Sequence, residues 1–242
     1  MKNKWFYDNA NYSYHEFDMV GDKFIDMMLK SARYDNIVSD DDINIQTSLY
    51  PFIPRTPYFV VSNTANEQLS MKHYPQKEFE ELVAKIREMG FWCVQLGRKE
   101  DNYINGAIDA RGATNLNQSA YVMQNSLGYI GIDGGLVHLA KAVGAKSVVA
   151  WSIFDHKVFG YDSNINLTQN KCKPCAWNLS GSHLHGKCLF GYRRCVNLPT
   201  VGQVVDGVVQ LLNKKELGVA EQKNCLHEQY REVKEEICQI SA

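Results

Sequence analysis

The sequence predicts an α/β fold, a parallel and doubly wound sheet with helices on both faces. Short apolar, β-branched runs alternate along the chain with segments whose apolar residues recur at helical spacing. Strands that alternate with helices in this way form βαβ units, which build parallel sheets. The composition, with 45% hydrophobic and 22% charged residues among 242, is that of a globular protein rather than a disordered one.

The regular pattern begins at residue 58. Tyr58–Ser62 is a short aromatic and β-branched run and predicts a strand. Apolar residues spaced i, i+3, i+4 and i+7 predict a helix over Gln76–Gly90, with Pro75 at its start and Gly90 in the position of a C-terminal cap. The remaining predicted elements are strand Phe91–Leu96, helix Asn117–Asn125, strand Gly128–Ile132, helix Leu136–Val143, strand Ser147–Trp151 and helix Val201–Leu212.

The chain divides into three parts. Residues 1–57 form a partial N-terminal segment and linker, irregular apart from a helix over Asp18–Arg33. Residues 58–215 form the α/β domain, with a cysteine-rich insert at 170–198 that lacks apolar periodicity. Residues 216–242 form a tail in which a charged helix is predicted.

Charge and hydropathy exclude several classes of protein. The net charge of −1 gives no electrostatic footprint for nucleic acid or for an anionic membrane surface. The longest apolar runs are far shorter than the roughly 20 residues of a membrane-spanning helix. Met1–Ala10 has no apolar core of a signal peptide. We therefore expect a cytoplasmic protein with no nucleic-acid partner and no integral membrane segment.

Polar loops follow the predicted strands. In an open parallel sheet, ligands bind beyond the carboxyl ends of the strands. The loops that the prediction places there are rich in glycine, hydroxyl groups, amides and charge. They are residues 62–64, 97–101, 113–115, 133–135 and 152–156.

Asp133-Gly134-Gly135 is the sharpest of these loops, because a strand ends there and a helix begins. Free N–H groups and the helix dipole make such a start a phosphate site, and glycine lets the backbone approach a ligand closely. The alternative is a plain strand–helix turn, with Asp133 as a cap and His138 in the core. On the residues alone, both interpretations stay open.

Four of the seven cysteines follow the spacing C-x2-C-x12-C-x6-C, at Cys172, Cys175, Cys188 and Cys195. Four thiolates form the ligand set of a structural iron or zinc site. A metal would also supply folding free energy to a segment that has little apolar pattern. Two disulfides or four free thiols are the alternatives, and a cytosolic context disfavours disulfides.

Several motifs together resemble glycosyltransferase family 9, the ADP-heptose-dependent heptosyltransferases. From Asp133 the chain reads D-x-G-x-x-H-L-A-x-A-x-G, and Lys72-His73-Tyr74-Pro75 with Phe79 is similar to the family's K-x-W-P-x-x-x-F. Gly112–Leu116 resembles the family's G-x-x-x-L, and many members carry a cysteine-bearing insert. The resemblance covers residues 58–212 and implies the Rossmann-like, donor-binding C-terminal domain of a GT-B fold.

The resemblance implies roles for the residues of these motifs. Lys72 would pair with the donor diphosphate; the alternative is an exposed lysine at a helix entry. The backbone N–H groups of Gly134 and Gly135, beside Asp133 and His138, would hold the diphosphate and the sugar.

Further donor contacts come from the other loops. Glu100 or Asp101 would bind ribose hydroxyls, the alternative being solvated loop charges. Ser62, Asn63 and Thr114 would line the nucleotide pocket.

The resemblance leaves the catalytic residues unassigned. The family's base is an Asp in a glycine-rich loop of an N-terminal domain, and residues 1–57 contain a single glycine, Gly21. A GT-B fold implies no catalytic metal, so the metal on the cysteines would be structural. Resemblance to the autotransporter-modifying heptosyltransferases, which carry iron on four cysteines, favours iron.

The predicted function is therefore transfer of a heptose from an ADP-sugar donor to a saccharide or protein hydroxyl. The alternative is a nucleotide-sugar-binding or assembly subunit, a half-enzyme without turnover. A zinc-ribbon nucleic-acid module is a third class, which the near-neutral charge disfavours. A domain cleft left uncovered by the short N-terminal segment favours a homo-oligomer.

Overall fold

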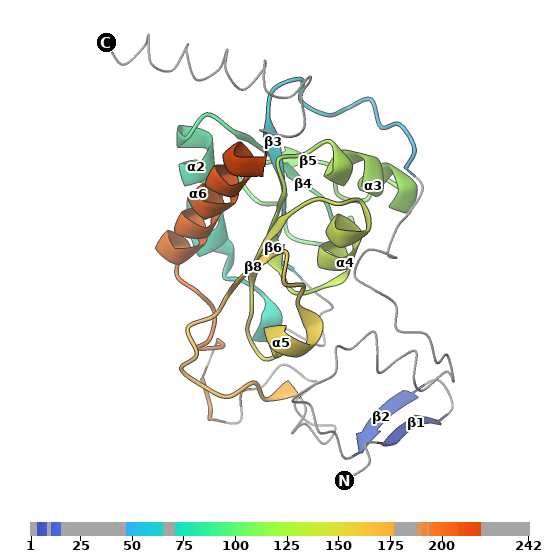
Figure 1. Ribbon diagram of the computed structural model, residues 1–242, viewed down its shortest axis with the longest axis vertical. Helices are drawn as coiled ribbons and strands as arrows, with labels where there is room; N and C mark the ends of the chain where they lie inside the picture. Colours follow the sequence, from blue (N-terminus) through green and yellow to red (C-terminus); the bar gives the residue numbers. More distant parts are fainter. Residues whose placement is uncertain are drawn as a thin grey trace.

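The computed structural model describes residues 4–8, 11–15, 47–64, 71–176, 188, 190–192 and 194–218. Its main feature is a six-stranded sheet with the strand order β5-β4-β3-β6-β7-β8 (Figure 1). Every neighbouring pair is parallel, which confirms the predicted fold class. The strands are β3 (Tyr58–Ser62), β4 (Trp92–Gln95), β5 (Ile108–Asp109), β6 (Tyr129–Ile132), β7 (Ser147–Ala150) and β8 (Ile165–Leu167).

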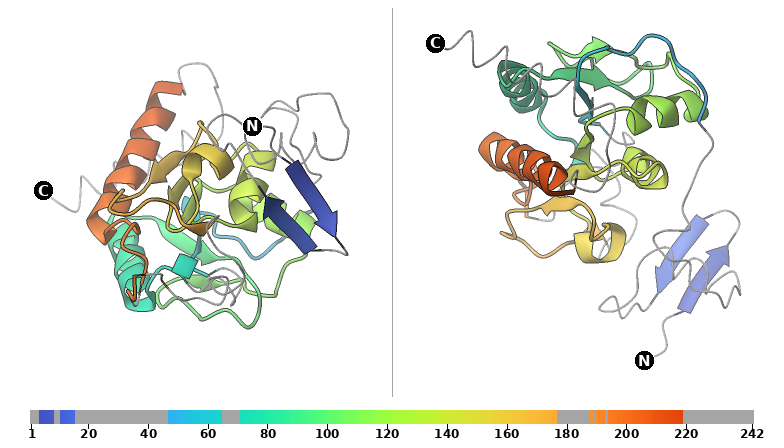
Figure 2. Two further views of the ribbon diagram at one scale, coloured as in Figure 1. Left: turned by 90° about the horizontal axis from the view of Figure 1, so that it is seen from below. Right: turned by 45° about the horizontal axis from the view of Figure 1, so that its top comes forward.

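Helices cover both faces of the sheet. On one face lie α2 (Gln76–Glu88) and α6 (Val201–Gly218), and on the other lie α3 (Leu116–Gln124) and α4 (Gly135–Ala142) (Figures 1 and 2). The short α5 (His156–Phe159) follows β7 at the carboxyl end of the sheet. This is the doubly wound arrangement that the alternation of strands and helices predicts.

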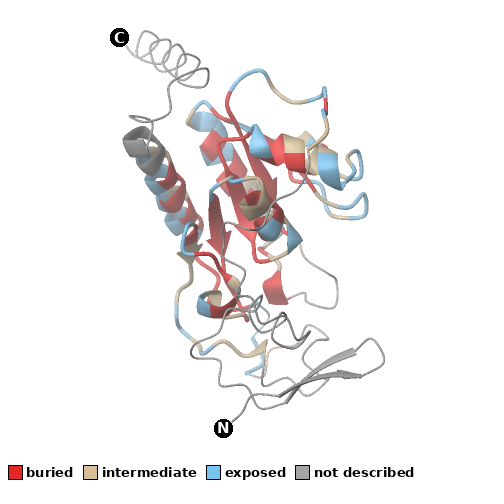
Figure 3. Ribbon diagram, turned by 45° about the vertical axis from the view of Figure 1, so that its right-hand side comes forward, coloured by how far each residue is buried: buried red, intermediate tan, exposed pale blue. Residues whose placement is uncertain are grey.

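The two faces of β3 belong to two separate apolar clusters. Phe59 and Val61 pack in the cluster beneath α2 and α6, whereas Tyr58 and Val60 pack in the one beneath α3 and α4. β3, β6 and β7 are buried along their whole length (Figure 3). A parallel sheet covered on both faces needs such continuous apolar strands, which is why β3, β6 and β7 are visible in the sequence as unbroken runs.

The boundaries of the predicted helices shift by a few residues. The helix predicted to reach Gly90 ends at Glu88, and Gly90 adopts φ +88° just beyond it, as a glycine after a helix does. The helix predicted from Asn117 begins at Leu116, because Asn115 caps it and exchanges hydrogen bonds with Gln118.

Three short elements of the α/β domain were not predicted: the strands β5 and β8 and the helix α5. They contain two, three and four residues, too few to show a periodicity. The sequence pattern places no element between Trp151 and Val201, and so it misses α5 and β8. Pairing with a neighbouring strand makes β5 and β8 part of the sheet, and this pairing is a tertiary property.

The N-terminal segment is also more regular than predicted. β1 (Lys4–Asp8) and β2 (Asn11–His15) form an antiparallel pair, and their aromatic residues have high strand propensity. Closer to the sheet, Tyr50 is buried and the Ser48 N–H donates to the Asn117 carbonyl, so the predicted linker lies against α3. The helices predicted over 18–33 and 226–240 lie outside the described residues. Within the described ranges, no helix is long and apolar enough to cross a bilayer.

Candidate functional site

The strand order reverses between β3 and β6. From β3 the chain runs to β4 and β5 on one side, and then returns to β6 on the other side of β3. Ligands bind at such a switch point, because the loops beyond the two central strands leave in opposite directions. Ser62 pairs in register with Gly131, so Asn63 and Asp133 follow neighbouring strand ends. Two of the predicted site loops therefore meet at the switch point.

Lys72 and Asp133 form a buried ion pair at this point. Lys72 Nζ lies 2.8 Å from Asp133 Oδ2, and the two side chains are only 9% and 7% exposed. The ring of Phe154, in the loop after β7, lies 4.6 Å from the same ammonium. The alternative of an exposed helix-entry lysine is therefore wrong. The cation is desolvated and aimed at the carboxyl edge of the sheet.

Two buried oxygens beside this pair have no hydrogen-bond partner within the described part of the chain: Oδ1 of Asp133 and Oδ1 of Asn63. Burial raises the pKa of the Asp133 carboxyl, and the Lys72 ammonium opposes that shift. The Asn63 amide nitrogen donates to Gln76 at the start of α2, which orients the amide. Buried polar atoms are normally paired, so these two oxygens are unsatisfied acceptors at the switch point.

Tyr129, which the sequence analysis did not single out, is buried on β6 close to Asp133. Its hydroxyl donates to the Ile132 carbonyl over 3.3 Å and hydrogen-bonds the Ser62 side chain. Burial and then the Asp133 charge raise the pKa of Tyr129. A Cβ on Gly131 would collide with this hydroxyl, so the glycine between Tyr129 and Asp133 is the one signal in the sequence that could have identified it.

The start of α4 is open. Gly134 is its N-cap residue and supplies no side-chain hydrogen bond. A Cβ built on Gly134 or Gly135 would meet no atom of the described residues within 4 Å. The first-turn N–H groups of a helix have no partner within the helix, so this turn has the backbone groups of a phosphate site.

His138 lies one turn further along α4 and is exposed, so the alternative that places it in the core is wrong. Its Nδ1 and the Tyr161 hydroxyl share a hydrogen bond of 2.7 Å. Desolvation of the ring and then the nearby Lys72 charge lower the pKa of His138. The lowered pKa favours the neutral imidazole.

The other predicted donor residues lie in the loops beyond β4 and β5. The Asp101 carboxylate accepts from the Arg98 backbone N–H over 2.7 Å and pairs with the Arg98 guanidinium. The Thr114 hydroxyl lies 2.7 Å from the Ser119 hydroxyl, and Glu100 is exposed. The structure brings together Ser62, Asn63, Lys72, Asp133, Gly134, Gly135 and His138, and it places Glu100, Asp101 and Thr114 elsewhere along the same edge.

The four spaced cysteines carry free thiols, so the predicted disulfide alternative is not observed. Burial raises the pKa of Cys195 to about 11, the Asn197 backbone N–H opposes this shift, and the charges of Cys175, Cys188 and Cys172 add to it. The four thiols therefore lie within electrostatic range of one another. Among the described residues, no three metal-binding side chains converge at coordination distance. Thiolates are the ligand type of a structural iron or zinc site, so the residue types fit such a metal, although the described geometry is not that of a formed site.

Comparison with protein families gives one match: the model of glycosyltransferase family 9 (heptosyltransferase) matches residues 22–179. Comparison with curated proteins gives no match.

Among solved structures, a family 9 glycosyltransferase from Veillonella parvula DSM 2008 is 14% identical, with a TM-score of 0.63 over 83% of this chain and 63% of that one. The iron-containing dodecameric glycosyltransferase TibC from enterotoxigenic E. coli H10407 is 18% identical, with a TM-score of 0.60 over 71% and 48%. The structure of TibC in complex with ADP-D-β-D-heptose is 15% identical, with a TM-score of 0.58 over 85% of this chain and 50% of that one. This chain thus shares their fold and spans about half the length of TibC.

Proposed function

This chain belongs to glycosyltransferase family 9, and from that premise we propose that it transfers a heptose from ADP-heptose to a saccharide or protein hydroxyl. The observation that carries the proposal is the buried Lys72–Asp133 pair at the switch point, next to the open start of α4. A desolvated cation beside free helix N–H groups is the arrangement that suits a sugar diphosphate.

The diphosphate is the leaving group of the reaction, and its charge grows as the glycosidic bond breaks. Lys72 and the N–H groups at Gly134 and Gly135 stabilise that charge without a catalytic metal. Asp133 Oδ1 and Asn63 Oδ1 accept from sugar hydroxyls, and neutral His138 adds a contact at the rim of the site. Since Lys72 is already paired with Asp133, the incoming diphosphate shares the ammonium with that carboxylate.

The nucleoside is held further along the same edge. Glu100, which is exposed, binds the ribose hydroxyls, and Asp101 shapes its loop by capping Arg98. Ser62 and Thr114 line the pocket. The complex of TibC with ADP-D-β-D-heptose, on the same fold, supports this donor.

The test is calorimetric titration with ADP, ADP-heptose and UDP-sugars, with product analysis of the same samples. We expect selective binding of the ADP ligands, with donor hydrolysis or transfer. Lys72→Ala should abolish binding, whereas Lys85→Ala, which removes an exposed lysine of α2, should not change it. Binding without turnover would favour the alternative function, a nucleotide-sugar-binding or assembly subunit. Absence of binding would reject both.

We propose further that Cys172, Cys175, Cys188 and Cys195 bind one structural iron or zinc ion. The close spacing of the four cysteines along the chain supports this site, and TibC, an iron-containing glycosyltransferase with the same fold, favours iron. The ion would tie together a segment that has few apolar residues of its own.

Elemental analysis of the purified protein tests the metal site. We expect about one ion per chain, lost in Cys175→Ser and kept in Cys93→Ala, because Cys93 lies in the core of the sheet. Loss of metal from neither variant would reject the four-cysteine site.

We also propose that the chain self-associates, since TibC is described as dodecameric. Sedimentation velocity should show a species larger than the monomer. A monomer at micromolar concentration would contradict this proposal.

A further inference from the structure

The loop after β7 connects the ion pair to the cysteine segment. Its residue Phe154 places its ring against the Lys72 ammonium, at 4.6 Å. The residue before it, Ile153, accepts two backbone hydrogen bonds from the cysteine segment, from the N–H groups of Cys175 (2.9 Å) and Ala176 (3.0 Å). The Ile153 carbonyl thus contacts the cysteine segment, and the ring of the next residue, Phe154, contacts Lys72.

Asn197 joins the two segments from a buried position. Its amide nitrogen donates both to the Ser152 carbonyl (3.3 Å) and to the Cys172 carbonyl (2.8 Å). Its amide oxygen accepts from the Cys172 N–H (2.8 Å). The residue is 3% exposed, so these bonds are shielded from water. One side chain therefore fastens the loop after β7 to the first cysteine.

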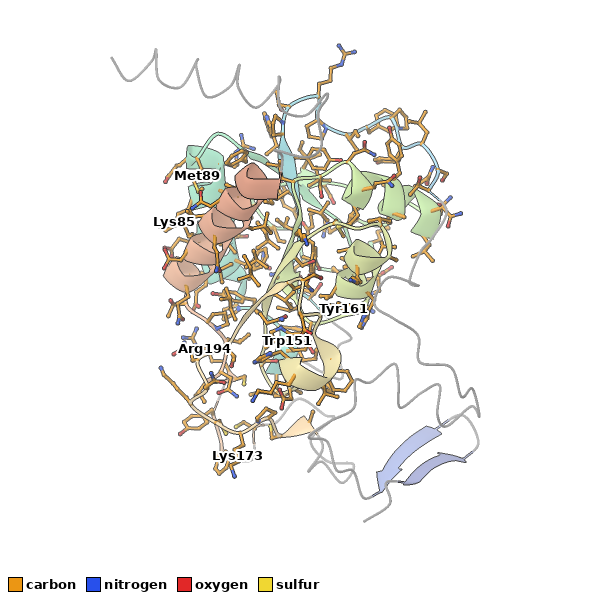
Figure 4. All side chains as sticks on the ribbon, viewed as in Figure 1. Lys85, Met89, Trp151, Tyr161, Lys173 and Arg194 are labelled. Carbon is orange, nitrogen blue, oxygen red and sulfur yellow. The ribbon has the colours of Figure 1, made fainter. Side chains whose placement is uncertain are left out.

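The residues around Asn197 lie toward the carboxyl end of the sheet, as Lys72 and Asp133 do. Figure 4 labels Trp151 at the start of the loop, and Lys173 and Arg194 beside the cysteines, all toward the carboxyl end of the sheet. The Asn197 backbone carbonyl accepts from Gln169 N–H, and Cys195 and Ile153 share one apolar cluster. The described residues of the cysteine segment thus contact the loop that reaches Lys72.

We propose that Asn197 is a positioning residue that couples the cysteine segment to Lys72 through Ser152–Phe154. When the segment is intact, Phe154 stays beneath the ammonium and Lys72 stays on Asp133, in place for a diphosphate. When Asn197 is removed, the loop loosens and Lys72 loses that position. The cysteine cluster then has a role beyond its own stability, because its integrity sets the affinity for the donor. The donor part of this inference rests on the proposed function, whereas the coupling to Lys72 does not.

Hydrogen exchange tests the coupling without any ligand. Asn197→Ala should speed exchange of the amides at Cys175 and Ala176 and also at Tyr74, whose N–H bonds the Asn63 carbonyl beside Lys72. Gln169→Ala is the matched control, because it removes a 2.7 Å bond to the Leu198 carbonyl without touching the loop after β7. Faster exchange confined to the cysteine segment would overturn the proposal. Asn197→Asp keeps the acceptor and loses the donors, and it serves if the alanine variant does not fold.

Titration with ADP measures the consequence for the donor. Asn197→Ala should weaken ADP binding about tenfold, as loss of a supporting contact does, while Gln169→Ala stays within about twofold. In a double-mutant cycle with Phe154→Leu, the two losses should not multiply, because both act through one loop. Multiplicative losses, or an unchanged affinity in Asn197→Ala, would overturn the coupling. If the wild-type protein binds no ADP, the proposed function fails, and hydrogen exchange still decides the coupling.

Discussion

Two regions of the same sheet edge treat their polar side chains differently. In the β4–β5 loops, residues 97–115, the charged and polar groups bind one another. Asp101 pairs with Arg98, Asp109 with Arg111, and Thr114 with Ser119. At the β3–β6 switch point, formed by Asn63, Lys72 and Asp133–Gly135, two buried oxygens have no partner in the described structure. A Cβ on either glycine would meet no described atom within 4 Å.

The difference separates polar residues whose bonds stabilise the fold from polar residues whose acceptors are unsatisfied in the described structure. A loop whose carboxylates are already hydrogen-bonded gains little from a new partner. A buried, unpaired acceptor costs about 1–3 kcal/mol in the free protein, and a ligand can recover that free energy. The comparison therefore predicts that substitutions of the paired carboxylates Asp101 and Asp109 mainly affect stability. Substitutions of Asn63, Lys72 and Asp133–Gly135 should affect binding, whether or not they also affect stability.

Breaking the ion pair should have the largest effect. Lys72→Met leaves Asp133 buried without its partner and should lower the free energy of unfolding by about 3–5 kcal/mol, with loss of ADP binding. Adding Asp133→Leu should restore stability, because an apolar pair replaces two charges, but should not restore binding. Chemical denaturation and ADP titration measure the two properties. Recovery of ADP binding in the double variant would contradict the assignment of the pair to the donor.

Gly135→Ala tests the open helix start at the next level. A Cβ there meets no protein atom, so stability should be unchanged or higher by up to about 1 kcal/mol, as for glycine-to-alanine changes in helices. ADP affinity should fall tenfold or more, because the Cβ occupies the space of the phosphate. Gly202→Ala, in the first turn of α6, is the control and should change stability alone. Equal ADP affinity in both variants would reject a phosphate site at α4.

The β4–β5 loops provide the opposite test, with a smaller effect on binding. Asp101→Ala removes the cap on Arg98 and should cost about 1.5–3 kcal/mol of stability. Glu100→Gln should leave stability unchanged and weaken ADP binding a few fold, with no effect on inorganic pyrophosphate, which lacks the ribose. If Asp101→Ala weakens ADP binding while stability is unchanged, Asp101 contacts the donor directly and the structural role assigned to it is wrong.

The pH dependence of His138 gives the smallest effect. Its pKa is lowered in the folded protein by desolvation and by Lys72, so the unfolded chain binds a proton more readily. The stability that the protein gains from a neutral His138 is fully present above the ordinary histidine pKa of 6.5. It is lost as the pH falls through the lowered pKa of the folded protein. His138→Gln should flatten the fall in melting temperature on the acid side of pH 6.5, and an unchanged slope would contradict the shift.

Much of the fold could be predicted from the sequence because burial leaves a local pattern. The runs at β3, β6 and β7 are apolar on both faces, and the spacing within α2 follows one buried stripe. The two-residue β5 and three-residue β8 could not be predicted, since a neighbouring strand makes them strands. The glycine turn before α4 could be predicted because an apolar strand ends and a helical pattern begins within three residues of each other.

The sequence by itself determined the α/β class, the position of the glycine turn between β6 and α4, and the family motifs, because each depends on residues close together in the chain. Only the tertiary structure decided which candidates meet. Lys72 and Asp133 are 61 positions apart, and the strand order that makes β3 and β6 neighbours brings them within 2.8 Å. The same packing places Asn197 between the cysteines and the loop after β7. Burial and partnership belong to the assembled fold, so only the fold could separate the paired Asp101 from the unpaired oxygens at the switch point.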